Sequence, residues 1–111
     1  MELAELTSPT VAWQERMEEG DDLFTEENVE AATEVLDAFI QDLQQAGENA
    51  TDKSIIACVK KVVLRLNEIN ETFEYFIETM EREELCEFII EAASIMGLEW
   101  EEDITEEWRE W

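Results

Sequence analysis

The 111-residue chain contains no histidine and only seven lysines and arginines. Without imidazole it has no Ser-His or Cys-His nucleophile, and it lacks the commonest general base. Its three glycines are isolated, so there is no glycine-rich phosphate loop. With 31 acids, carboxylate pairs at helical spacing, such as Glu83 with Glu87 or Glu87 with Glu91, arise by chance. We therefore expect no enzyme, no catalytic residues and no cofactor.

The same absence limits metal binding. A ferritin-like di-iron site needs histidine. Asp and Glu suit Ca²⁺ and Mg²⁺, but an EF-hand loop places its acids on alternating positions around a central glycine. Neither the acids around Gly20 nor those at 99–103 have that spacing. We expect no dedicated metal site.

Long apolar runs are missing, and cysteine is scarce. No run approaches the length of a membrane span, and the segment after Met1 is acidic where a signal peptide would be basic. Cys58 and Cys86 lie in apolar surroundings, whereas a disulfide framework normally needs more cysteines in a secreted chain. These features predict a cytoplasmic protein with two free, buried thiols.

What the chain has in excess is negative charge, and the formal net charge is −24. Residues 1–30 carry a net −9, residues 31–66 a net −1 and residues 67–111 a net −14. A field of this sign repels nucleic acid and anionic membranes and attracts cationic proteins over distance. We expect a basic protein as the partner, with no nucleic acid and no membrane.

The composition nevertheless favours a folded chain. Disordered acidic chains are poor in aromatic and branched apolar residues, whereas this one is 45% apolar with five Phe and four Trp. The length fits one domain, and no Gly/Ser/Pro-rich linker divides it. We predict a single acidic helical domain over 1–111.

Helix signals divide the first half of the chain clearly. Ser8 as N-cap and Pro9 at the first helical position open a short helix that ends at Gly20, with Trp13 as a core anchor. Thr25 caps a second helix that Gly47 stops. Its inward positions recur at steps of three and four: Val29, Ala32, Leu36, Phe39, Ile40 and Leu43.

Thr51 or Asp52 is expected to cap a third helix, the least acidic of the set. Its apolar positions are Ile55, Ile56, Val59, Val62, Val63, Leu66 and Ile69. The polar residues at 67–70 weaken the pattern. Residues 73–77 either extend this helix or form an extended connector with Phe73, Tyr75 and Ile77 on one side.

Thr79 is the expected cap of a fourth helix that Gly97 ends. Its inward residues are Leu85, Phe88, Ile89, Ala92, Ala93 and Met96. Asp103 with Glu106 three residues on is a capping-box pattern for a short terminal helix. The fold class predicted is all-α, a small bundle of four to five helices.

Residues 99–111 combine three tryptophans with seven acids. An aromatic–acidic patch suits a basic partner, because tryptophan supplies buried contact area and carboxylates pair with Arg or Lys. Trp108 fits the bundle core equally well, whereas the final residue, Trp111, is harder to bury. The candidate partner-binding residues are Trp100, Asp103, Glu106, Glu107, Trp108 and Trp111.

The last third of the chain also resembles short acidic bacterial proteins of the toxin-immunity kind. The resemblance is carried by Ile-Glu-Thr at 77–79, Glu-Arg-Glu-Glu-Leu-Cys-Glu-Phe-Ile at 81–89 and Asp-Ile-Thr-Glu-Glu-Trp-Arg at 103–109. It implies a protein that binds a cognate toxin, often a cationic nuclease, and blocks its active site or substrate surface. It assigns no individual functional residues.

Three hypotheses for function follow. The first is an immunity protein that neutralises a nuclease-type toxin by masking its nucleic-acid-binding or active-site surface. The second is a phage or plasmid nucleic-acid mimic that disables a restriction or CRISPR effector. The third is a structural or adaptor protein, possibly a homodimer, whose charge serves solubility. Identification of the partner separates them.

Overall fold

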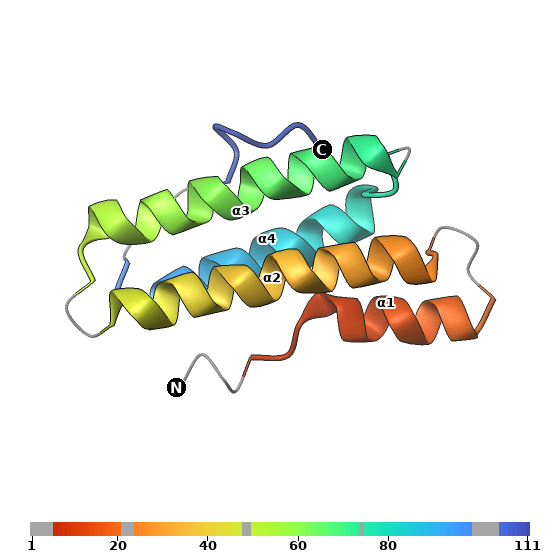
Figure 1. The fold of residues 1–111 in the computed structure, drawn as a ribbon, viewed down its shortest axis with the longest axis horizontal. Coiled ribbons are helices and arrows are strands. Elements are labelled where there is room, and N and C mark those ends of the chain that lie inside the picture. Colours follow the sequence, from red (N-terminus) through yellow and green to blue (C-terminus); the bar gives the residue numbers. More distant parts are fainter. Residues whose placement is uncertain (1–5, 21–23, 48–49, 74, 99–104) are drawn as a thin grey trace.

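The computed structural model describes residues 6–20, 24–47, 50–73, 75–98 and 105–111. Four helices form: α1 Pro9–Glu18, α2 Glu26–Ala46, α3 Asp52–Thr72 and α4 Thr79–Ile95 (Figure 1). The described residues include no strand. The prediction of a small all-α bundle is therefore confirmed.

Successive helices run in opposite directions and are joined by short connections (Figure 1). The two longest, α2 and α3, pack side by side along their length, and α4 lies behind them. The much shorter α1 packs on α2 and α4 and covers only the part of the bundle near the start of α2. The C-terminal residues 105–111 lie along the outer side of α3 (Figure 1).

Three of the four predicted N-caps are present. The Ser8 hydroxyl accepts a hydrogen bond from the Thr10 backbone N–H, and Pro9 occupies the first turn. Thr25 and Thr51 each form a reciprocal capping box with the residue three positions on. These caps satisfy backbone N–H groups that have no partner inside the helix.

The N-cap of α4 is Glu78, so the prediction of Thr79 is wrong by one residue. The reason is the carboxylate of Glu81, three residues further on, which the sequence does not distinguish from the many other acids. Glu81 is buried, and its carboxylate accepts a hydrogen bond from the Glu78 backbone N–H at 3.2 Å. Thr79 becomes the first helical residue because this acceptor, and not the threonine hydroxyl, holds the helix start.

One apolar core runs through the bundle and draws on every helix. The predicted stripes of α2, α3 and α4 point inward, and Ile40, Ile56, Ile69 and Met96 pack at its edge. Trp13 is fully buried, stacks on Phe24 with ring centroids 5.4 Å apart and meets the edge of Phe76 at 6.0 Å. The prediction that Trp13 anchors the short first helix is confirmed.

The polar residues at 67–70 do not weaken α3, which continues to Thr72. Both asparagines of this stretch are buried, and the Asn70 side-chain oxygen accepts a hydrogen bond from the Ile77 N–H at 2.9 Å. After Phe73 the chain leaves the helix. Asparagine side chains that bond to other segments stabilise the helix they sit in through tertiary contacts.

Neither alternative for residues 73–77 is correct, because α3 ends at Thr72 and the connector does not place Phe73, Tyr75 and Ile77 on one side. Phe76 and Ile77 are buried, whereas Tyr75 is 66% exposed. Tyr75 adopts a left-handed backbone conformation with φ of 63°, and its N–H bonds to the Asn70 carbonyl. This local reversal turns the tyrosine outward while the two following side chains enter the core.

The predicted terminal helix is a single turn in the described residues, and its proposed cap, Asp103, lies outside them. The N–H groups of Trp108 and Arg109 both bond to the Thr105 carbonyl. The next N–H, that of Glu110, bonds instead to the Asn67 side chain of α3 at 3.0 Å. The turn stops because this side chain takes the donor that a further helical turn needs.

Both cysteines are free and half-buried, less buried than expected. Burial raises the pKa of the Cys58 thiol above its ordinary value, and the nearby Asp42 carboxylate raises this pKa further. None of the helices in the described ranges has the length and apolar character needed to cross a bilayer.

Replacing Trp13 tests how firmly α1 is docked. Trp13→Ala should lower the free energy of unfolding by about 3–5 kcal/mol, because it empties a buried aromatic site. Val11→Ala, on the exposed side of the same helix, should change it by less than about 0.5 kcal/mol. Urea denaturation at fixed salt measures both. A loss below about 1 kcal/mol for Trp13→Ala would show that α1 contributes little to the fold.

Candidate functional site

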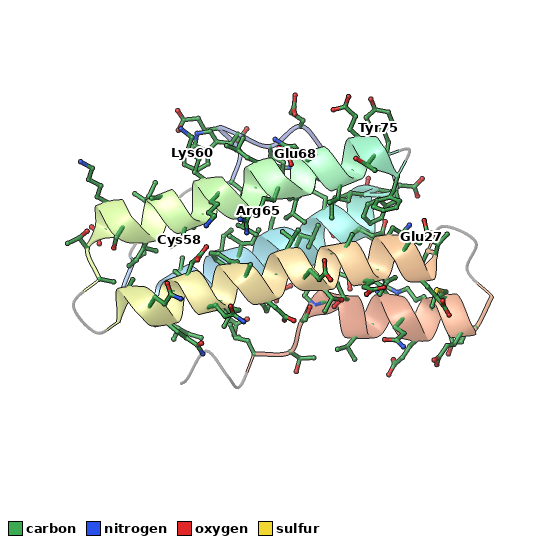
Figure 2. The ribbon with its side chains drawn as sticks, in the orientation of Figure 1. Glu27, Cys58, Lys60, Arg65, Glu68 and Tyr75 are labelled. Carbon is green, nitrogen blue, oxygen red and sulfur yellow. The ribbon has the colours of Figure 1, made fainter. Side chains whose placement is uncertain are left out.

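The most extensive feature of the surface is exposed carboxylate. On α2, Glu27, Glu30, Glu34 and Asp37 are all exposed, and their spacing of three and four residues places them in one row along the helix. Figure 2 shows Glu27 near the start of that row. The outer positions of α1 and α4 carry further acids: Glu15, Glu18, Glu83, Glu87 and Glu91. The outside of the bundle therefore presents negative charge over three helices.

The bases are too few to neutralise these acids, and two of them are engaged between helices. Lys61 of α3 pairs with Asp42 of α2 at 3.3 Å. Arg16 of α1 reaches α4, where it is held by Glu84 and Glu81. No other ion pair occurs within the described ranges. Most of the acidic surface is thus left to solvent or to a partner.

Arg16 is the centre of a polar tie between α1 and α4. Its two terminal nitrogens donate to the two oxygens of Glu84 at 2.8 and 3.0 Å, a bidentate arrangement. The indole N–H of Trp13 donates to the same carboxylate at 3.3 Å. Glu84 is therefore oriented by two residues of α1, which fixes the position of the short helix along α4.

Glu81 lies on the inner side of this tie and is only 4% exposed. Its carboxylate is 3.5 Å from the Arg16 guanidinium and accepts the Glu78 N–H. Burial raises the pKa of Glu81, and this effect outweighs the hydrogen bond and the nearby Arg16 charge, both of which lower it. The group is thus a desolvated acid held in place by its neighbours.

An open groove runs between the start of the chain and α4, and we call it the α4 groove. Its volume is about 490 Å³. The lining residues are Leu6, Thr7 and Pro9 on one side and Glu84, Glu87, Phe88 and Glu91 on the other. Three carboxylates at positions i, i+3 and i+7 of one helix thus meet an apolar floor.

A second groove lies at the opposite end of the Arg16 tie, where α4 begins. Its volume is about 740 Å³, and Arg16 and Arg82 line it together with Glu78, Glu81 and Met80. Because charges of both signs meet there, this groove lacks the single sign of potential found in the α4 groove.

The predicted C-terminal patch is only partly exposed. Glu106 and Glu107 face solvent, but Trp108 and Trp111 are half-buried and pack against the core. Trp100 and Asp103 lie outside the described residues. The assignment of all six as partner-binding residues stays a prediction, and the described tryptophans have a packing role beside any contact with a partner.

Two contacts fasten this tail to the bundle. The Asn67 side-chain amide donates to the Trp108 carbonyl at 2.8 Å while its oxygen accepts from Glu110. Thr105 is fully buried, and its hydroxyl lies 3.4 Å from the Cys86 sulfur. At the end of the chain, the Arg109 guanidinium stacks over the Trp111 ring at 5.5 Å.

In the part of the chain that the structure describes, no three His, Cys, Asp or Glu side chains gather as a metal site. The α4 groove was not predicted, although the spacing of Glu84, Glu87 and Glu91 was visible. The sequence could not show that residues 6–9 would lie beside those acids and turn a solvated helix face into a groove.

Comparisons of the chain with protein-family models, with curated proteins and with solved structures find no match.

The raised pKa of Glu81 gives a pH-dependent prediction. Because the pKa is higher in the folded protein than in the unfolded chain, Glu81 adds stability when protonated in acid, and that contribution is lost as the pH rises through the folded-state pKa. Glu81→Gln should therefore stabilise the fold at neutral pH. Its difference from wild type should disappear below the ordinary glutamate pKa.

Thermal unfolding between pH 3 and pH 8 measures this difference, with Glu83→Gln as the control. Glu83 lies on the exposed side of the same helix, and its replacement removes the same charge. If Glu81→Gln is less stable than wild type at neutral pH, the attraction between Glu81 and Arg16 outweighs the cost of burying the carboxylate.

Asn67 tests how the tail is held. Asn67→Ala removes one donor and one acceptor from the tail, which should lower the free energy of unfolding by about 1–3 kcal/mol. Hydrogen exchange of the Glu110 amide should also become faster. Gln44→Ala is the control, because it removes an exposed side-chain amide from α2. Unchanged protection of Glu110 would show that the asparagine does not fasten the tail.

Proposed function

We propose that this protein is an acidic inhibitor that binds a basic protein and masks its nucleic-acid-binding or active-site surface. In this proposal it serves as an immunity protein that neutralises a nuclease-type toxin. The partner's lysines and arginines, which would otherwise hold phosphate groups, meet carboxylates of the inhibitor instead.

The observation that carries the proposal is the surplus of exposed carboxylates over internal ion pairs. Acids are exposed on α1, α2 and α4, whereas Arg16 and Lys61 form the ion pairs found among the described residues. A field of one sign steers a cationic partner and accelerates association by long-range attraction. Such a surface disfavours nucleic acid as a ligand for the same reason.

In the same mechanism, the C-terminal tail forms part of the rim of the contact with the partner. Glu106 and Glu107 are exposed on it and can pair with basic side chains at the edge of the contact. Rim charges act mainly on the association rate, whereas buried aromatic contacts act mainly on dissociation. Trp108 and Trp111 are partly accessible, and their contact with the partner would act mainly on the dissociation rate.

The test begins with the partner captured from the protein's own cells and identified by mass spectrometry. We expect a basic protein whose nucleic-acid-directed activity is lost when the inhibitor binds. The association rate should fall at least about tenfold as the Debye length shrinks from about 30 Å at 0.01 M salt to about 3 Å at 1 M, with a smaller change in dissociation.

A chelator should leave the inhibition unchanged, since masking by carboxylates requires no metal. An acidic partner would contradict the proposal, and so would an association rate that does not depend on salt.

A further inference from the structure

We propose that the α4 groove receives an arginine side chain of the basic partner. This inference rests on the proposed function and names the chemistry that the partner presents at one place on the acidic surface. Three observations support it: the recess itself, two carboxylates that pair with no base of the described residues, and the apolar side chains of the groove lining.

The carboxylates of Glu87 and Glu91 are the groups that need a partner. Both are exposed, and neither forms an ion pair with any base in the described residues. Side chains four positions apart on a helix are neighbours, with about 5–6 Å between their Cβ atoms, and two like charges at this spacing repel each other. A cation placed between them relieves that repulsion.

Glu84 completes the acidic wall in a different way. Its two oxygens are already bonded to Arg16 and Trp13, so its position in the groove is fixed before any partner arrives. Leu6 and Pro9 on the opposite side, and Phe88 beside the acids on α4, provide apolar surface. Long basic side chains bury their methylene stems on apolar surface while the charged end stays among polar groups.

Arginine fits this arrangement better than lysine does. The guanidinium presents five N–H donors in a planar fork and can bond to two carboxylates at once. It is also more weakly hydrated than an ammonium group, so it loses less on entering a partly apolar groove. The volume of about 490 Å³ is ample for one such side chain.

The two other candidate surfaces are less suited to a cation. Arg16 and Arg82 line the groove at the start of α4 and would repel it. On the C-terminal tail, Trp108 and Trp111 already pack against the core. Of these three surfaces, the α4 groove is the one that combines a recess, apolar lining and carboxylates that pair with no base of the described residues.

The experiment uses the full chain and two blocked peptides, acetyl-Gly-Arg-Gly-Arg-Gly-amide and its lysine counterpart. Titration of the ¹⁵N-labelled protein at low salt should shift the backbone amides of Leu6, Glu87, Phe88 and Glu91 most strongly with the arginine peptide. The double change Glu87→Gln and Glu91→Gln should weaken this binding by about fivefold or more.

The matched control is the double change Glu68→Gln and Glu71→Gln, which removes the same charge from exposed positions of α3. It should weaken binding by less than about twofold, as expected for screened surface charges. All four positions are exposed and glutamine is a good helix former, so both variants should fold.

Equal effects of the two double variants, or a larger effect of the α3 variant, would overturn the groove and leave the proposed function standing. Equal affinity for the lysine peptide at the groove would overturn the preference for arginine. If neither peptide bound at low salt, the groove would be ruled out as a cation site. The salt dependence of the cellular partner would then decide the proposed function by itself.

Discussion

Repulsion among 31 carboxylates is the constraint that the rest of the structure has to meet. Nearly all acids of the described residues lie on outer positions, and apolar residues from every helix join the helices in one core. The tight packing of the near-neutral α3 against α2 gives the bundle a centre in which little charge opposes close approach. The helices α1 and α4 then pack around that pair.

The few polar side chains inside the bundle act as ties between segments. Arg16 joins α1 to α4 through Glu84, Asn70 holds the entry to α4 and Asn67 holds the C-terminal tail. Each tie satisfies groups whose burial without a partner would be costly. The short α1 depends most on them, because apart from Trp13 and Thr10 none of its side chains is fully inside.

Much of the fold could be predicted from the sequence, because its signals are local. Ser8, Thr25 and Thr51 cap helices through residues two or three positions away, and the apolar stripes follow helical spacing. The errors arose where the burial of one side chain or a distant contact decides the local structure. The buried Glu81 moved the start of α4, and Asn67 stopped the terminal turn by taking the Glu110 N–H.

The candidate site was less predictable for the same reason. With acids in every helix, no spacing singles out Glu84, Glu87 and Glu91, and their groove exists only because residues 6–9 lie beside α4. From the sequence, the tryptophans of the tail could either pack in the core or contact a partner. The structure gives Trp108 and Trp111 a share in packing and leaves part of each ring accessible.

If the exposed carboxylates serve a partner and not the fold, removing some of them should stabilise the free protein. The most direct measurement is the free energy of unfolding of the triple variant Glu30→Gln, Glu34→Gln and Asp37→Asn at low ionic strength. These three lie in one exposed row of α2, where like charges repel. We predict that the variant is more stable than wild type and that the difference fades as salt screens the repulsion. A variant less stable than wild type at low ionic strength would show that these carboxylates support the fold, and would contradict the assignment of the acidic surface to a partner.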